Sequence, residues 1–564
     1  MKEDQTNNRR FSELATLLVI VGIWVSVACL INPCGDFPLA DDWAYSRAVK
    51  TLLEDGRLRF VQIVTPNIIG QVVWGALFCL PFGFSFTTLR ISTLTLGAVG
   101  VLALYGLLRE AYPDHKTALF GSLLLAFNPH YLVLAYTFMS DVPFTAITIL
   151  SIYFLARGMK GNSRLEVATG LLVACAALLI RQAGLAIFVG FGLAYLVKSG
   201  LRLRNLGLAS LPAVLGVIVQ IVWDRWMQYK QISPAFHSLQ AGRVLSPQSY
   251  LSWLAAEHLA AGFVTVFVYL GLFLFPLLLL VIRRSWTDPT RSRILTLTTL
   301  ACAAVAAYEL SYRRMPLVPN VFYDFGLGTA TLRDAYLLKM RGAGEAFWFV
   351  VTEVGFAGAV ALLYLTLIAI GKAVKLRTPG TSGNRELMVM LLACGLFYIV
   401  PVAILNSIGE AYDRYVLFLV PLGITTIIIF ATDVGPSKTW SSAIALAVVS
   451  LALYGSFSVA GTHDYLSWNR ARWQALNDLM TERRLPASQI DGGYEFNGWS
   501  LRDSEYRTTP QEKLSSVDRD DFLVAFGPVQ GFTEIRRYPY RRWIAPAQGN
   551  ILVLQRIKSN ARGR

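Results

Sequence analysis

Charged residues are scarce in this sequence. Only 15% of its 564 residues are Asp, Glu, Lys or Arg, and 54% are hydrophobic. Soluble domains carry about 25% charged residues, so the composition excludes an ordinary soluble protein. The apolar residues form blocks of about 15 to 25, the length that a helix needs to cross a hydrocarbon core of about 30 Å. Because no water enters that core, each block must satisfy its own backbone hydrogen bonds as a helix.

Several familiar signatures are also missing. The six cysteines show neither metal nor disulfide spacing, and the sequence has no zinc signature, Gly-rich phosphate loop or G-x-S-x-G elbow. Paired spans broken by Gly and Pro, which mark many inverted-repeat carriers, are absent too, and this speaks against a carrier. The net charge of +15 lies mostly in short loops beside apolar blocks. We therefore interpret it as topology signals and lipid-headgroup contacts, and expect no nucleic acid partner.

About thirteen spans are predicted, each an apolar block of spanning length. The first follows Arg9 and Arg10 and has no small-residue cleavage site, so we expect it to remain as an uncleaved span. The predicted spans cover residues 14–31, 89–108, 117–135, 142–156, 165–180, 183–197, 206–226, 258–282, 294–310, 346–370, 387–405, 416–431 and 440–460.

The block 68–86 is apolar but is interrupted by glycines and Pro81. If it is re-entrant or interfacial, one side of the membrane holds about 20 Lys and Arg in about 70 loop residues, against about 12 in about 115 on the other. If the block 68–86 crosses the membrane, the Lys and Arg residues are distributed over the loops of both sides without a consistent excess on one. Since basic residues gather in cytoplasmic loops, we predict that this block does not cross and that the N-terminus is cytoplasmic. The first loop, 32–67, and the tail after residue 460 are then outside.

The predicted fold is an all-α polytopic membrane protein with a small C-terminal α/β soluble domain. Residues 1–460 form the membrane domain, whose loop 32–67 carries an interfacial helix, and residues 461–564 form the outside domain. The tail opens with a helix on which four apolar side chains share a face, and strand-like runs follow at 522–526 and 551–557. The four side chains are those of Trp468, Trp473, Leu476 and Met480.

Three acids at the predicted outer face are candidates for chemistry. Asp41 and Asp42 begin the interfacial helix, where one Asp serves as an N-cap. Adjacent helical side chains point about 100° apart, so the second acid can face a cavity. Asp141 precedes Pro143 at the start of the fourth span. It is either another helix cap or a carboxylate placed at the membrane surface for function.

Two arginines are candidates for binding an anion. Arg181 lies between two short spans at the predicted outer face, and Arg414 begins the twelfth span. Either side chain can simply snorkel, or Arg414 can pair with the neighbouring Asp413. The alternative is that both guanidinium groups bind a phosphate headgroup. Arg313 and Arg314 offer a weaker version of the same site.

The order and sidedness of three short motifs resemble the GT-C glycosyltransferases. The resemblance is strongest to the family 39-type enzymes, which include protein O-mannosyltransferases and are similar to the aminoarabinose transferase of lipid A. It covers most of the membrane part and is weak in the tail. The motifs are Asp41-Asp42-Trp43-Ala44-Tyr45, Ser140-Asp141-Val142-Pro143, and Arg414-Tyr415 with Pro421 beyond.

The resemblance implies a membrane glycosyltransferase that uses a polyprenyl-phosphate-linked sugar. Asp41 matches the position of the family's catalytic acidic residue, and Asp42 stands where a Glu often occurs. Asp141 matches the second loop acid. The acceptor is a lipid, glycan or protein, and the implied location is the cell inner membrane with the site on the periplasmic face.

One departure from the family concerns the donor phosphate. The aminoarabinose enzymes carry Lys-Pro-Pro after the first loop, whereas this chain has no Lys in 65–71. The phosphate contact then falls to Arg181 and Arg414, with Tyr415 beside them. Tyr45 and Tyr412 are expected in the substrate pocket.

Alternatives to a monosaccharide transferase remain open at this stage. No cofactor is required, but a divalent Mg²⁺ or Mn²⁺ held by Asp42 and Asp141 is one option. A flippase or exporter of lipid-linked sugars would use the same cations without consuming the donor. A lipid-linked oligosaccharide polymerase or ligase is a neighbouring enzymatic alternative, and a non-enzymatic envelope scaffold is a third.

Overall fold

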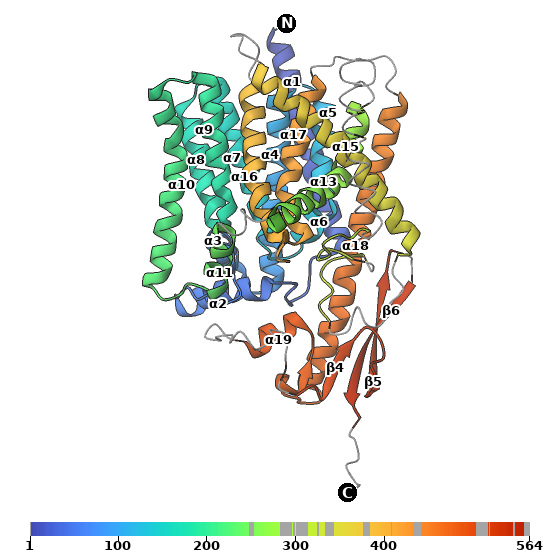
Figure 1. Cartoon of the computed structure of the whole chain (residues 1–564). Helices are drawn as coiled ribbons and strands as arrows, with labels where there is room; N and C mark the ends of the chain where they lie inside the picture. Colours follow the sequence, from blue (N-terminus) through green and yellow to red (C-terminus); the bar gives the residue numbers. More distant parts are fainter. Residues whose placement is uncertain are drawn as a thin grey trace.

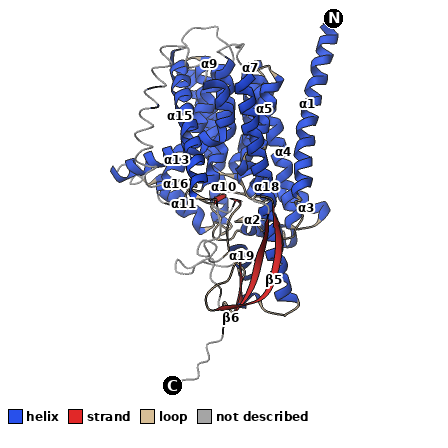
Figure 2. Ribbon diagram, turned by 90° about the vertical axis from the view of Figure 1, so that its right-hand side faces the viewer, coloured by secondary structure: helices blue, strands red, loops and turns tan. Residues whose placement is uncertain are grey.

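Long helices run side by side in one bundle, and the larger sheet lies at one end of it (Figures 1 and 2). This arrangement comes from a computed structural model. It describes residues 2–246, 253–282, 296, 299, 314–323, 326–332, 343–375, 384–407, 409–432, 441–502, 517, 519–544 and 547–557.

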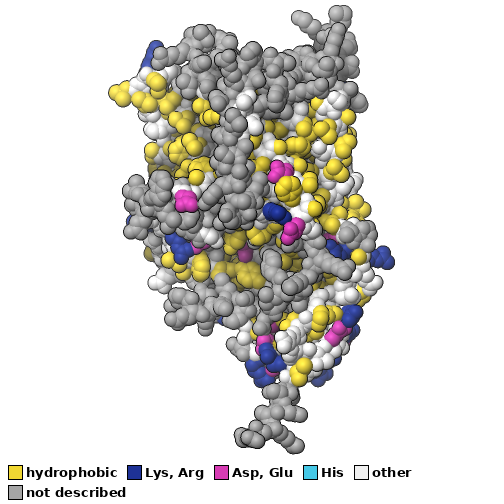
Figure 3. Space-filling model, turned by 45° about the vertical axis from the view of Figure 1, so that its right-hand side comes forward, with side chains coloured by type: hydrophobic (Ala, Val, Ile, Leu, Met, Phe, Trp, Pro, Cys, Tyr) yellow, Lys and Arg dark blue, Asp and Glu magenta, His cyan; other side chains and the backbone are white. Residues whose placement is uncertain are grey.

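Within the described residues, ten helical segments are long and apolar enough to cross a membrane. Figure 3 shows the apolar side chains on the flank of the bundle, while many of the charged ones gather on the domain below it. The chain is thus a multi-pass membrane protein, as its composition predicted. The helices of these segments are α1 (Lys2–Ile31), α4 (Phe86–Ala111), α7 (Asp141–Gly161), α9 (Leu185–Ser199), α10 (Leu203–Tyr229), α13 (Trp253–Ile282), α15 (Glu345–Lys375), α16 (Asn384–Ser407), α17 (Leu419–Thr432) and α18 (Ser441–Thr481).

Three predicted spans differ from these ten. The span 117–135 is broken into α5 (His115–Ala126) and α6 (Pro129–Ala135), which are bent by 60°. The Asn128 side chain caps α6 by accepting from two of its backbone N–H groups, and Pro129 follows it. The span 165–180 is the 17-residue helix α8 (Arg164–Ile180). The span 294–310 lies outside the described residues, apart from two isolated positions.

Two short helices lie between α1 and α4. The predicted interfacial helix is α2 (Asp42–Asp55), and the block 68–86 contains α3 (Ile69–Phe82). At 1.5 Å per residue, the 14 residues of α3 rise about 21 Å, which is less than the hydrocarbon core of about 30 Å. The length of α3 therefore agrees with a segment that enters the bundle surface without crossing. A further short helix, α11 (Ala235–Leu245), follows α10.

A buried arginine on α4 fixes the start of the first loop. The Arg90 guanidinium donates to the carbonyl groups of Pro33, Gly35 and Phe37, and its side chain also lies over the Phe37 ring. Arg90 is only 1% exposed, so these carbonyl partners replace the water that a charged group would otherwise need. The loop is in this way fastened to the bundle just before Asp41.

One long helix connects the bundle to the C-terminal domain. The 41-residue α18 leaves the bundle and continues into the domain, so the predicted boundary at 460/461 falls inside a helix. The other elements are the strands β3 (Ile490–Asp491), β4 (Phe522–Ala525), β5 (Phe532–Arg542) and β6 (Ala547–Arg556), with α19 (Tyr494–Leu501) after β3. The sheet order is β3-β4-β6-β5; β3 pairs parallel to β4, and the other pairs are antiparallel.

The outer turns of α18 pack on this sheet through the predicted apolar face. Trp468 and Leu476 are almost fully buried, and the Trp468 ring meets Phe526 edge-on. A two-stranded hairpin, β1 (Phe322–Tyr323) and β2 (Gly326–Leu327), packs against the same helix. The predicted strand-like runs at 522–526 and 551–557 correspond to β4 and to the second half of β6.

We predict that Gly358→Leu destabilises the bundle. A Cβ at Gly358 would collide with the backbone of Gly271, where α15 and α13 approach most closely. Glycine at such a crossing lets two membrane helices touch, and overpacking costs about 1–3 kcal/mol or more. Thermal unfolding in detergent, followed by tryptophan fluorescence, should show a midpoint lowered by several degrees. Gly22→Leu on α1 is the matched control, because a Cβ at Gly22 meets nothing within 4 Å; equal midpoints for the two variants would refute this account.

Candidate active site

Two ion pairs join segments that are far apart in the sequence. Asp41 precedes α2, and its Oδ2 lies 2.9 Å from Nη2 of Arg414, in the short 3-10 helix η3 (Asp413–Phe418). Asp141 is the first residue of α7, and its Oδ1 lies 2.9 Å from Nη2 of Arg181, which follows α8. Arg181 also donates from Nε to the Ser140 hydroxyl at 2.9 Å.

The two pairs flank a single aromatic ring. The Tyr415 ring centroid lies 5.6 Å from the guanidinium carbon of Arg181 and 5.8 Å from that of Arg414. The structure therefore brings two of the three predicted acids, Asp41 and Asp141, together with Arg181 and Arg414. We call Asp41, Asp141, Arg181 and Arg414 the acid–arginine cluster.

Burial differs among the members of this cluster. The side chain of Asp141 is 2% exposed and that of Arg414 is 6% exposed, whereas that of Asp41 is 29% exposed. Charges inside a protein attract more strongly than in water, but each needs a partner. Asp41 is thus the acid with an open side, while Asp141 is enclosed beside Arg181.

Arg414 does not pair with its neighbour in sequence, and that alternative is wrong. The Asp413 carboxylate accepts from the backbone N–H groups of Val321 and Phe322, and it lies 3.3 Å from Nε2 of His130. Arg414 instead donates to Asp41 and to the side-chain oxygen of Asn320 at 3.0 Å. Two loops that follow different spans are thereby tied to η3.

Asp42 occupies a different environment from Asp41. Its two carboxylate oxygens accept from the backbone N–H groups of Leu39 at 2.6 Å and Phe138 at 3.1 Å. Burial raises the pKa of Asp42 to about 8, and the two N–H groups oppose that shift. One acid of the adjacent pair thus ties the first loop to the loop before α7, and the other belongs to the acid–arginine cluster.

The predicted metal ligands do not fit a divalent cation. Both oxygens of Asp42 already face backbone donors, and Asp141 faces the positive charge of Arg181. Across the described part of the chain, no three His, Cys, Asp or Glu side chains are grouped as metal ligands. We therefore derive no step through a metal.

Two further tyrosines border the cluster. Tyr45, on α2, is buried. Its burial, and to a smaller extent the nearby Asp41 carboxylate, raises the pKa of Tyr45, so its hydroxyl stays neutral. Tyr412 is 40% exposed, and the Arg414 guanidinium carbon lies 4.7 Å from its ring centroid. Both residues therefore lie next to charged members of the cluster, on its buried and exposed sides.

The stretch that lacks the family's Lys packs beside Arg181. The Gln182 side chain donates to the carbonyl of Thr65, and the Ile68 N–H donates to the carbonyl of Ile180. Arg181 thus lies next to the stretch 65–71, which contains no Lys. Arg314, ranked lower, pairs with Glu345 where both side chains are exposed, and Arg313 lies outside the described residues.

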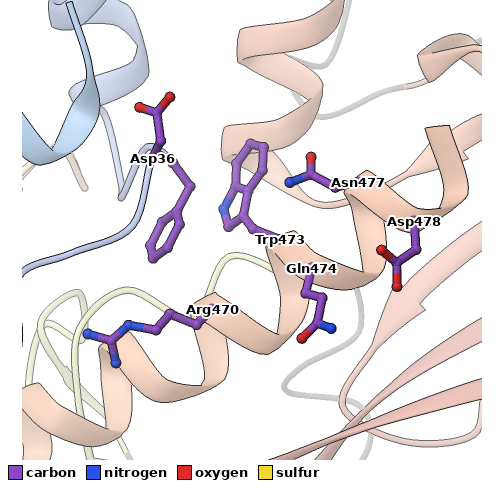
Figure 4. A pocket seen from close by; sticks show the side chains of 7 residues that line it. Asp36, Arg470, Trp473, Gln474, Asn477 and Asp478 are labelled. Atoms are coloured by element: carbon purple, nitrogen blue, oxygen red, sulfur yellow. The ribbon is translucent and has the colours of Figure 1, made fainter. Parts of the chain in front are cut away.

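A separate cavity of about 350 Å³ opens between the first loop and the outer part of α18 (Figure 4). Its three charged side chains are already engaged: Asp36 accepts from the Phe86 N–H, Arg470 donates to carbonyls of the first loop, and Asp478 accepts from Tyr538. Its lining residues are Asp36, Phe37, Arg470, Trp473, Gln474, Asn477 and Asp478. Because no member of the acid–arginine cluster lines it, we assign it no role in the chemistry.

Sequence reasoning missed two residues of the site, Asn320, which accepts from Arg414, and Tyr494. The Tyr494 hydroxyl, at the start of α19 in the C-terminal domain, donates to Oδ1 of Asp41 at 2.9 Å. A sequence signal was present in the Gly492–Gly493 pair just before it, since glycine pairs mark close backbone approaches. The tail lies outside the strong part of the family resemblance, so no family motif marks Tyr494.

Part of this site lies in a segment that is similar to a known protein family. A family model described as "Dolichyl-phosphate-mannose-protein mannosyltransferase" matches residues 73–224, about a quarter of the chain. The matched segment contains Asp141 and Arg181. It confirms, for this segment, the resemblance to GT-C enzymes of the mannosyltransferase type that the motifs indicated. No curated protein sequence matches the chain.

Among solved structures, the chain is similar to ArnT from Cupriavidus metallidurans bound to undecaprenyl phosphate. The TM-score is 0.39 at 13% identity, over 97% of this chain and 99% of that one. The apo state of ArnT gives 0.39 at 12% identity, over 96% and 98%. The S. cerevisiae protein O-mannosyltransferase Pmt1-Pmt2 complex bound to the sugar donor gives 0.31 at 14% identity, over 40% of this chain and 34% of that one. None of these likenesses is close enough to transfer a residue's role.

We predict that Asp42→Asn removes a pH dependence of stability. The folded chain holds the Asp42 proton up to about pH 8, whereas an unfolded chain releases it near pH 4. Between these values the folded state binds more protons, so the stability from Asp42 falls as pH rises. Asparagine does not titrate and costs about 1–3 kcal/mol through the acceptor it loses. The thermal midpoint of the wild type minus that of the variant should therefore fall by several degrees from pH 5 to pH 8. A difference that stays constant or rises with pH would refute this environment for Asp42.

Proposed function

We propose that this chain is a membrane glycosyltransferase. It moves a sugar from a polyprenyl-phosphate donor to an acceptor hydroxyl or amine. The observation that carries the proposal is the acid–arginine cluster, because it sets one accessible carboxylate beside two guanidinium groups. The mannosyltransferase family model, which matches the segment containing half of the cluster, supports the same activity.

Asp41 is the proposed general base. Its Oδ1 and Oδ2 each accept one hydrogen bond, and its side chain keeps an open side through which an acceptor can approach. As the acceptor atom attacks the anomeric carbon, Asp41 takes its proton. The bond between that carbon and the phosphate oxygen breaks in the same step, so a single displacement inverts the anomeric centre. General-base assistance of this kind contributes about 10²–10⁴ in rate.

Arg181 and Arg414 are the proposed donor-phosphate site. The departing polyprenyl phosphate gains negative charge, and fixed cations in a buried site stabilise such charge without reorganisation. The Arg414 side chain is 6% exposed and that of Arg181 is 12% exposed, and their guanidinium carbons lie 5.8 and 5.6 Å from the centre of the Tyr415 ring. Because phosphate is a good leaving group, one base and these cations suffice, and no acid has to protonate it.

Asp141 is proposed to act through Arg181. It is the most deeply buried acid of the cluster, and its oxygens lie beside the Arg181 guanidinium without a hydrogen bond of good geometry. A carboxylate in this position keeps a buried guanidinium charged and oriented. Asp42 is proposed to hold the first loop in place through its two backbone contacts.

The proposed location is the cell inner membrane, with the cluster on the periplasmic side. Asp41 lies at the start of α2, at the end of the bundle that bears the C-terminal domain (Figure 1). The count of basic loop residues assigns that end to the outside. A lipid-linked donor reaches such a site laterally from the outer leaflet, and the acceptor arrives from the aqueous side.

We predict that Asp41→Asn abolishes sugar transfer. The variant keeps hydrogen-bond acceptance but loses the base, so turnover should fall by about 10²–10⁴. The assay uses full-length protein in nanodiscs, a panel of radiolabelled undecaprenyl-phosphate monosaccharides, and cell-envelope extract as the acceptor source. It measures labelled product together with released undecaprenyl phosphate.

The wild-type result separates the competing functions. A transferase consumes the donor and releases undecaprenyl phosphate, whereas an exporter leaves the donor intact on the opposite leaflet. Full turnover in Asp41→Asn, with thermal unfolding like that of the wild type, would end the assignment of Asp41 as the base. No consumption of any donor by wild-type protein would end the transferase proposal itself.

We predict that Arg414→Ala weakens donor binding. A hydrogen bond to a charged group is worth about 1.5–3 kcal/mol, so the affinity for the probe undecaprenyl phosphate should fall about 10- to 100-fold. Tryptophan fluorescence titration in nanodiscs measures that affinity. Arg314→Ala is the matched control, since it removes the same side chain from an exposed ion pair. If both variants bind the probe as tightly as wild type does, the phosphate site lies elsewhere.

A further inference from the structure

The C-terminal domain reaches the candidate base through the first two residues of α19. The Tyr494 hydroxyl donates to Oδ1 of Asp41 at 2.9 Å, and Oε1 of Glu495 accepts from the Ala40 N–H at 3.0 Å. Ala40 has a φ of +54°, a conformation that residues with a side chain rarely adopt. The backbone that presents Asp41 is therefore in an unusual turn, and α19 holds that turn.

These contacts are anchored inside the C-terminal domain. The other carboxylate oxygen of Glu495 lies 2.9 Å from Nη1 of Arg472 on α18, and both side chains are fully buried. Arg472 also donates to the carbonyl of Gly492 from two of its nitrogens, at 2.9 and 2.7 Å. Separating the two partners of a buried ion pair leaves an uncompensated buried charge, which strongly destabilises the fold. The start of α19 therefore has little freedom to move relative to α18.

A second set of contacts packs α19 directly against α2. The Trp43 ring meets the Tyr494 ring edge-on at 6.0 Å, and Gly498 lies so close to Trp43 that a side chain there would collide with the indole. Further along, the Arg47 guanidinium donates to the Trp499 carbonyl at 2.5 Å and lies over its ring. The first two turns of α2, which begins beside Asp41, thus pack on the C-terminal domain.

We propose that Tyr494 is a positioning residue that completes the active site from the C-terminal domain. This inference rests on the proposed function, in which Asp41 is the base. Arg414 takes one oxygen of Asp41 and Tyr494 takes the other, so two donors from different domains fix the plane of the carboxylate. The carboxylate keeps an accessible side, since the Asp41 side chain is 29% exposed. Burial and the Asp41 carboxylate raise the pKa of Tyr494 well above the usual range, so its hydroxyl stays protonated and serves as a hydrogen-bond donor.

The chemical consequence is a specific split in the kinetics. An acceptor has to meet the carboxylate at hydrogen-bond distance while it attacks the anomeric carbon, and a small loss of orientation is costly in rate. The donor phosphate contacts belong to Arg181 and Arg414 and stay intact without the tyrosine hydroxyl. Loss of that hydroxyl therefore lowers kcat and leaves the KM for the donor unchanged.

Tyr494→Phe in the full-length protein tests this role. We expect kcat to fall about tenfold or more, since a hydrogen bond to a charged group is lost, with the donor KM within about twofold. Hydrogen exchange followed by mass spectrometry gives a readout that needs no substrate. Backbone amides in residues 38–45 should exchange about tenfold faster in the variant, while amide exchange in the C-terminal domain away from Tyr494 stays unchanged.

Tyr538→Phe is the matched control. Tyr538 lies on β5 and donates to Asp478 at 2.7 Å, so this change removes an equivalent tyrosine–carboxylate hydrogen bond from the same domain, away from Asp41. It should leave kcat and the exchange of 38–45 as in the wild type. If Tyr494→Phe matches Tyr538→Phe in either kcat or exchange, the inference is overturned.

Failure of the inference and failure of the proposed function give different results. If Asp41→Asn is inactive and Tyr494→Phe has wild-type kcat, Asp41 remains the base and only the role of Tyr494 is lost. If Asp41→Asn keeps full turnover, the proposed base falls, and with it the positioning role for Tyr494. Exchange in 38–45 then still reports whether the two domains meet at this point.

Discussion

The ion pair between Asp41 and Arg414 is the contact on which the candidate site depends. It joins the first loop to the start of a late span across 373 residues of sequence. Neither partner is stable alone in this place, because a largely buried guanidinium needs a counter-charge. The Tyr415 ring lies near the guanidinium groups of both Arg414 and Arg181. The second pair, Asp141 and Arg181, therefore meets the first at this side chain.

Much of this arrangement could be predicted because the membrane simplifies the problem. Apolar blocks of spanning length predict helices, and loop charge predicts their sides, so two acids far apart in sequence could be expected at one face. The same logic located α2 and indicated that α3 does not cross. What the sequence did not reveal is the break in 117–135, where an apolar block hides an Asn cap and a proline start within one predicted span.

The roles within the adjacent acids show where sequence reasoning stops. Geometry along a helix indicates that Asp41 and Asp42 point in different directions, but not which acid faces the cluster. That choice is made by tertiary contacts, since the N–H groups of Leu39 and Phe138 claim Asp42. Tyr494 and Asn320 escaped notice for a related reason: each contacts the cluster from a segment without a spanning pattern, and a hydroxyl or amide has no signature until its partner is known.

The length of α18 limits how the outer domain can move. At 1.5 Å per residue its 41 residues extend about 60 Å, roughly twice the hydrocarbon thickness, with no loop where the helix leaves the bundle. A domain carried on such a rod cannot swing as one tethered by a flexible linker does. The place of α19 beside α2 is therefore set by a continuous helix rather than by a hinge.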